Sequence, residues 1–173
     1  MRIFVIFIII ILLLSSCVIV DTFPITSIVG NYKKSQQVIS EYCKDKMFNE
    51  AIYGLQKFDF KDELGNVIIL PNIFFKQKSG DCDDFAVASC MIAQYFGYES
   101  YIGYLIFDGY LLHYNCIIKT PIGFAIVERG YLIGFFATPE LTAKAYLKQY
   151  NSAKYIEIKS FERFLQDIGI DDL

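Results

Sequence analysis

A chain of 173 residues has room for one compact domain and a short appendage. Charged residues make up 20%, the two signs are interspersed, and the formal net charge is −3. No basic stripe stands out, which argues against nucleic acid as a partner. The 13 Tyr and 16 Phe supply enough apolar material for a core that needs neither disulfides nor a structural metal ion.

The first residues form an apolar leader that follows a single positive charge. Arg2 precedes an uncharged run from Ile3 to Val20. The stretch Leu14-Ser15-Ser16-Cys17 is similar to a lipobox, in which the Cys after the cut carries the lipid. Residues 1–16 would then be removed as the signal peptide, and Cys17 would be lipidated.

A retained helical anchor is the alternative, since this uncharged run of 18 residues rises about 27 Å against a hydrocarbon core of about 30 Å. Both interpretations leave Arg2 on the cytoplasmic side. We therefore expect a membrane-anchored protein of the cell envelope, with residues 17–34 as a tether and residues 35–173 as one extracytoplasmic domain.

The first half of that domain carries two kinds of pattern. Residues 35–58 have apolar side chains at mostly helical spacings, which predicts one or two helices. Residues 59–79 contain Gly65-Asn66 and an apolar run that Pro71 stops, so we expect irregular structure there.

The clearest helix of the sequence runs from Cys82 to Phe96. Asp81 is a good N-cap, Asp84 completes an acidic variant of the capping box, and Gly97 suits the C′ position. The helix is strongly apolar, so we expect it to be buried.

The remainder is predicted to be mostly strands. Hairpin signals at Asp108-Gly109 and Pro121-Ile122-Gly123 separate runs of aromatic and branched residues. The predicted strands are 98–107, 110–120, 124–128, 131–137 and 154–159, and the predicted helices are 139–150 and 160–166. A helix followed by an antiparallel meander indicates an α+β fold.

Cys82 is the candidate nucleophile. At the first position of a capped helix, backbone N–H groups and the helix dipole stabilise a thiolate. The same N–H groups can form part of an oxyanion hole. A thiol also needs a base, and the chain has one histidine, His113. A hairpin returns Glu128 to the level of His113, where a carboxylate would hold the imidazole in the right tautomer. Simpler interpretations remain, with His113 as a half-buried structural residue and Glu128 as a solvated edge residue.

These residues carry a resemblance to a known family. Gly80 to Ala86 read Gly-Asp-Cys-Asp-Asp-Phe-Ala. This resembles the nucleophile motif of the transglutaminase-like superfamily, and most closely that of the bacterial transglutaminase-like cysteine proteinases, Gly-Asp-Cys-Glu-Asp-Tyr-Ala. His113 and Glu128 follow in the family's order and at its approximate spacing. The resemblance implies a papain-like core, with the nucleophile helix packed on an antiparallel sheet and a Cys-His-acid triad.

The sequence departs from the family at the third member. The family usually has Asp where this chain has Glu128, and Arg129-Gly130 replaces an Asn-containing segment. Gln77 is a candidate for the second oxyanion donor, although a surface Gln explains it equally well.

Acidic residues around the nucleophile present a conflict, because nearby carboxylates raise the pKa of a thiol. In some members of the bacterial proteinase family, acids that flank the cysteine bind calcium, and Asp81 and Asp83 match those positions. Calcium is therefore a candidate ligand, as hard oxygen donors suit it, while the triad itself requires no cofactor. Helix capping is an adequate alternative explanation for the acids.

Cysteine counting leaves the redox state open. With Cys17 lipidated and Cys82 a free thiol, the three that remain cannot all pair, and their connectivity is not deducible. Burial as small apolar residues is the simpler interpretation for Cys90 and Cys116.

The expected function is that of a cysteine peptidase or amidase that acts on protein or peptide substrates through an acyl-thioester. Transfer of the acyl group to an amine is a variant of the same chemistry. Two alternatives stay open: a non-catalytic transglutaminase-like binding or scaffold module of an envelope lipoprotein, and an unrelated lipoprotein that carries the motif by accident.

Overall fold

The structure, a computed structural model, describes residues 27–62, 67–107, 111–148 and 154–170. The leader with Cys17 and the expected turn at Asp108-Gly109 lie outside these ranges. Among the helices within them, none combines the length and the apolar character needed to cross a membrane.

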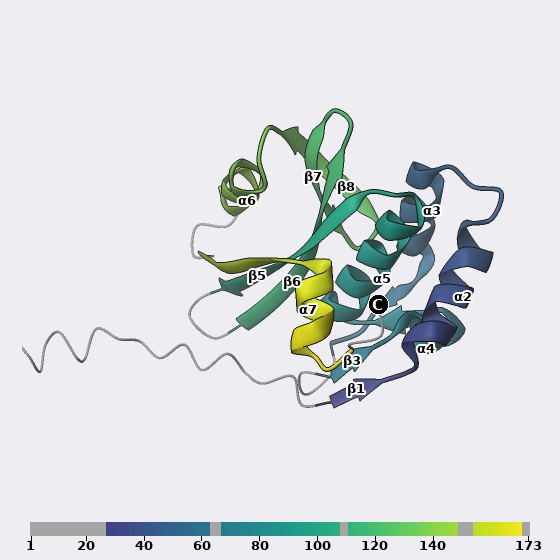
Figure 1. Cartoon of the computed structure of the whole chain (residues 1–173). Helices are drawn as coiled ribbons and strands as arrows, with labels where there is room; N and C mark the ends of the chain where they lie inside the picture. The colour runs from purple at the N-terminus through teal and green to yellow at the C-terminus, as the bar shows by residue number, and fades with distance from the viewer. Residues whose placement is uncertain (1–26, 63–66, 108–110, 149–153, 171–173) are drawn as a thin grey trace, which may run out of the picture.

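Five antiparallel strands form the main sheet, in the order β8-β7-β6-β5-β9 (Figure 1). The strands are β5 (Glu99–Phe107), β6 (Leu111–Thr120), β7 (Gly123–Glu128), β8 (Tyr131–Phe136) and β9 (Lys154–Ser160). Strands β5 to β8 each pair with the next along the chain, which is the predicted meander, and β9 adds to the outer side of β5.

Helices cover both faces of this sheet (Figure 1). They are α2 (Tyr32–Cys43), α3 (Phe48–Gly54), α4 (Pro71–Gln77), α5 (Cys82–Tyr95), α6 (Pro139–Leu147) and α7 (Phe161–Asp167), with a short 3₁₀ turn η1 (Leu55–Lys57). Helix α5 packs on the sheet within the main core, which α2, α3, α4 and α7 complete, whereas α6 covers the opposite face.

Alternation along β6 separates two groups of side chains. Tyr114, Cys116 and Ile118 are buried in the main core against α5. Ile117 belongs instead to a smaller cluster with Tyr146 of α6. Because side chains of a strand alternate between faces, His113 shares the α6 face with Ile117.

The nucleophile helix forms where the sequence predicts it. The carboxylate of Asp84 accepts a hydrogen bond from the backbone N–H of Asp81 at 3.2 Å, as the acidic capping box requires. Every side chain from Asp83 to Ala93 is buried, which confirms the expectation of a buried helix.

The segment 59–79 differs from the prediction of irregular structure. Two short parallel pairs form, β1 (Ser27–Val29) with β3 (Val67–Ile69) and β2 (Asp59–Phe60) with β4 (Ser79–Gly80). Helix α4 follows β3, with Pro71 at its first position. Proline lacks the N–H that is unpaired at a helix start and has a helical φ, so Pro71 begins a helix here rather than only ending the apolar run.

Part of the stretch expected to be a tether forms regular structure. Strand β1 and the start of α2 both precede residue 35. The side chain of Asn31 accepts from the N–H of Lys34 at 2.9 Å and so caps α2. Asn is common in turns, and it is equally common at helix N-caps, so the residue type alone does not distinguish the two.

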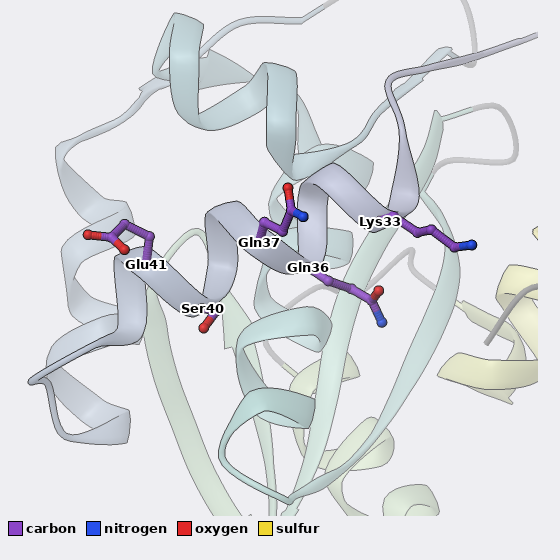
Figure 2. A pocket seen from close by; sticks show the side chains of 5 residues that line it. All are labelled: Lys33, Gln36, Gln37, Ser40 and Glu41. Carbon is purple, nitrogen blue, oxygen red and sulfur yellow. The ribbon is translucent and has the colours of Figure 1, made fainter.

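The outward face of α2 is polar (Figure 2). Its side chains surround an open, shallow hollow, and they are Lys33, Gln36, Gln37, Ser40 and Glu41. All five come from α2, so among the described residues this hollow is lined by one helix.

The β7–β8 turn allows a matched test of close packing. Gly130 has φ +82°, and a Cβ there would lie 2.8 Å from the backbone N of Gln56 and 2.9 Å from the carbonyl oxygen of Ile52. Gly97 has a similar φ of +78° with open space around it. We expect Gly97→Ala to cost about 1 kcal/mol of unfolding free energy from φ alone, and Gly130→Ala about 1–3 kcal/mol more. Urea unfolding measures both, and equal losses would contradict the packing argument.

Candidate active site

Cys82 is the first residue of α5 and is half-buried. Its sulfur accepts a hydrogen bond from the backbone N–H of Tyr114 on β6. That contact joins the start of the nucleophile helix to the strand that carries His113.

The surroundings of Cys82 disfavour its thiolate. Burial is the largest cause that raises the pKa of this thiol, and the charges of Asp83, Asp81 and Glu128 raise it further. The hydrogen bond from Tyr114 acts in the opposite direction. The acidic neighbours therefore raise the pKa of the Cys82 thiol as expected, and desolvation of the thiol raises it more than they do.

His113 and Glu128 meet as the hairpin predicts. Nε2 of His113 lies 3.0 Å from Oε2 of Glu128, and both side chains are largely buried. Cys116 pairs with Val127, so the register continued by one residue sets Glu128 opposite Asn115. His113 is then a diagonal neighbour of Glu128 on the same face, within reach of a long side chain.

Tyr146 of α6 also contacts Glu128. Its hydroxyl donates to Oε2 of Glu128 at 3.1 Å, the same oxygen that His113 contacts. The tyrosine is buried, so its hydrogen bond holds the carboxylate in place on the α6 face of the sheet.

Cys82 contacts β6 at the edge of that strand, through the backbone of Tyr114, and not across a face of the sheet. Strand β7 partners residues 116–120 of β6 and ends at Glu128, and Cys82 lies next to the backbone of Tyr114, just beyond that pairing. Cys82 and the His113–Glu128 pair thus border the same stretch of β6, although α5 and α6 cover opposite faces. Since Nε2 of His113 contacts Glu128, Nδ1 is the nitrogen that would accept a proton from a thiol.

Three carboxylates cluster around the start of α5. One oxygen each from Asp81, Asp83 and Asp84 lies within 4.8 Å of the others. Asp84 is used by the fold, because its two oxygens accept from the N–H of Ile69 at 2.6 Å and of Asp81 at 3.2 Å. Oδ1 of Asp81 and Oδ1 of Asp83 are buried without a hydrogen-bond partner among the described residues.

This cluster raises the pKa of the Asp83 carboxyl. Burial is the main cause that raises the pKa of Asp83, and the hydrogen bond and charge of Asp81 add to it, followed by those of Asp84. Buried oxygens without donors are what a hard cation would bind, so Asp81 and Asp83 fit the predicted calcium ligands.

Gln77 lies at the exposed end of α4, two residues before β4. Its side-chain amide donates to the carbonyl oxygen of Ser79 at 3.0 Å. The residue is therefore tied to the segment that leads into Cys82, and its part in an oxyanion hole stays a prediction.

Arg129 and Phe60 border the site, and the sequence pattern predicts no role there for either residue. The guanidinium of Arg129 lies 4.9 Å from the centre of the Phe60 ring, and its Nε is 4.0 Å from Oε1 of Glu128. Phe60 pairs with Gly80, at the start of the nucleophile motif. Their approach depends on β2 pairing with β4, which no local pattern marks.

The raised pKa of Asp83 gives the protein a defined pH dependence in the presence of a chelator. A carboxyl that titrates higher in the folded than in the unfolded state loses stability as pH rises above the unfolded value. We expect the unfolding free energy to fall between about pH 4 and about pH 8, and Asp83→Asn to be more stable at pH 8 by about 1–3 kcal/mol. Chemical denaturation across this range measures both curves. Parallel curves for the two proteins would show that Asp83 is ionised in the native state.

Comparisons place the fold. No family model matches the sequence, and no curated protein matches it. The chain superposes on Legionella pneumophila LapG with a TM-score of 0.50 and 14% identity, over 82% of this chain and 87% of that one. A calcium-bound LapG structure gives a TM-score of 0.49 and 17% identity, over 73% and 72%. At 14% identity this likeness concerns the fold alone, and it agrees with the α+β fold that the Gly80–Ala86 motif implies.

Proposed function

We propose that this protein is a membrane-anchored, extracytoplasmic cysteine peptidase or amidase of transglutaminase-like type, acting on protein or peptide substrates. The observation that carries the proposal is the 3.0 Å contact between His113 and Glu128. The residue after His113 on β6, Tyr114, donates its backbone N–H to the Cys82 sulfur. The proposal assigns Cys82, His113 and Glu128 the roles of nucleophile, base and acid.

Each residue has a distinct role in this proposal. The Cys82 sulfur attacks the substrate carbonyl carbon while Nδ1 of His113 takes the thiol proton. His113 returns that proton to the leaving amine, and Glu128 stabilises the imidazolium that exists in between. Tyr146 keeps Glu128 in position through the 3.1 Å hydrogen bond. Water or an amine then resolves the acyl-thioester.

The oxyanion would be held at the start of α5. Backbone N–H groups of the first helical turn have no partner within the helix and point toward its N-terminal end. Gln77 is the candidate for the second donor, from the segment tied to Ser79.

Calcium fits the proposal through Asp81 and Asp83. Their buried Oδ1 atoms would supply two of its oxygen ligands. A bound cation would offset two of the charges that raise the pKa of Cys82 and make the thiolate more accessible.

Anchoring rests on the sequence of the leader. A lipid on Cys17, or a retained apolar helix between Ile3 and Val20, would keep the domain at the outer side of a membrane. A substrate would then be met at the membrane surface or within the envelope.

The second candidate is a non-catalytic binding or scaffold module. It is favoured by the raised pKa of Cys82 and by the Glu128-Arg129 departure from the family pattern. The two candidates differ in whether His113 activates Cys82.

Thiol alkylation separates these candidates. We expect Cys82 in the reduced protein to react with iodoacetamide at pH 7 about 10²-fold faster than in His113→Ala, because the base supplies the thiolate. Cys43, Cys90 and Cys116 are buried and would react slowly for that reason alone. The Cys82 rate is therefore compared with the Cys82 rate in His113→Ala, and not with the rates of the other thiols. Mapped mass spectrometry over time measures the rates. The same Cys82 rate in both proteins would leave the binding-module function.

Calcium addition is a second test. We expect millimolar Ca²⁺ to raise the melting temperature and the alkylation rate of Cys82, and the chelated protein to lose both gains. Asp83→Asn should respond weakly, whereas the exposed Asp59→Asn should respond like the parent. An unchanged melting temperature in the parent on adding Ca²⁺ would remove calcium from the proposal.

A further inference from the structure

Two buried thiols touch between α5 and β6. The sulfurs of Cys90 and Cys116 lie 2.9 Å apart, and both residues have no exposed surface. A disulfide bond is about 2.05 Å long, so the sulfurs need to approach by less than about 1 Å to be joined. We propose that Cys90 and Cys116 form a disulfide that fastens the nucleophile helix to the histidine strand.

The backbone around the two thiols holds them in this position. The Ser100 hydroxyl donates to the carbonyl oxygen of Cys90 at 3.4 Å, and the Cys90 thiol lies 3.6 Å from the carbonyl oxygen of Tyr101. These contacts attach the middle of α5 to β5. Cys116 lies on the face of β6 that α5 covers and pairs with Ile102 of β5. Both cysteines are thus fixed through the same neighbouring strand.

The pairing also resolves the cysteine count. Of the four described cysteines, Cys82 is half-buried at the site and Cys43 is buried on α2. Cys90 and Cys116 are the described pair whose sulfurs are in contact. The bond leaves Cys82 as a thiol and Cys43 as a single buried cysteine.

Formation of the bond requires an oxidant that itself contains a disulfide, such as oxidised glutathione or a thiol–disulfide oxidoreductase. One cysteine thiolate attacks that disulfide and releases one oxidant thiolate, and the second cysteine thiolate displaces the other. The protein loses two protons and two electrons, and the oxidant becomes two thiols. Burial raises the pKa of Cys90 well above its usual range in the folded state. The exchange therefore belongs to folding, before α5 closes on the sheet.

The bond would tie together the two elements on which the candidate site depends. Cys90 lies on the helix that begins with Cys82, and Cys116 lies three residues after His113. The closed loop from 90 to 116 contains β5 and His113. Cross-linking it restricts the unfolded chain and so stabilises the fold. The inference does not depend on catalysis, since a binding module of this fold would gain the same stability.

Redox mapping of the full chain in detergent is the test. The protein is refolded with a mixture of oxidised and reduced glutathione. It is then denatured in the presence of iodoacetamide, which blocks free thiols, and in the absence of reductant, and its digest is mapped. We expect a linked Cys90–Cys116 peptide, with Cys82 and Cys43 alkylated. Complete alkylation of Cys90 and Cys116, or a bond that includes Cys82 or Cys43, would overturn the proposal.

Thermal unfolding supplies the second measurement. A reductant should lower the melting temperature of the parent by about 5–10 °C. Cys43→Ala, the control with another buried thiol, should show the same difference. Cys90→Ala and Cys116→Ala should show none, and a difference that persists in both would contradict the assignment. Mapping of the parent decides the question even if a variant fails to fold.

Discussion

The buried carboxylate of Asp84 is the interaction on which the rest of the site depends. It accepts one hydrogen bond from Asp81, which fixes the start of α5, and one from Ile69, which fixes β3 against that start. A fully buried carboxylate is costly unless both oxygens are satisfied, and here each has a backbone donor. The position of Cys82 is therefore set by an interaction between segments, and Oδ1 of Asp81 and Oδ1 of Asp83 accept no hydrogen bond within the described part of the chain.

The end of β7 fixes the position of Glu128, as Asp84 fixes the start of α5. Arg129 and Gly130 both have positive φ and join Glu128 to Tyr131 in a two-residue turn. By turning there, β7 leaves the edge of β6 near Tyr114 available to the start of α5. A longer β7 would pair with that edge and exclude Cys82. Glu128 is thus both the last residue of its strand and the partner of His113, so turn geometry and candidate chemistry are set by the same residues.

The predictable part of this structure is the part encoded in neighbouring residues. The caps of α5 are local, and so are the hairpins, whose register brings His113 to Glu128. What was missed depends on distant segments. Tyr146 reaches Glu128 because α6 packs on one particular face, and Arg129 meets Phe60 because β2 pairs with β4. Helix α4 was missed for another reason, since proline marks both the end of an apolar run and the first position of a helix.

The candidate site residues Cys82, His113 and Glu128 all lie between β4 and β7, while α2 and α3 precede them and α6, β9 and α7 follow. Within that stretch, helix α5 leads directly into a meander whose strands pair with their chain neighbours. Such contacts have low contact order, because each closes only a short loop and loses little chain entropy. The stretch that carries Cys82, His113 and Glu128 is therefore the part of the molecule best suited to fold first. The elements on either side then cover its two faces, and they add Tyr146 from α6 and the backbone N–H of Ile69 from β3.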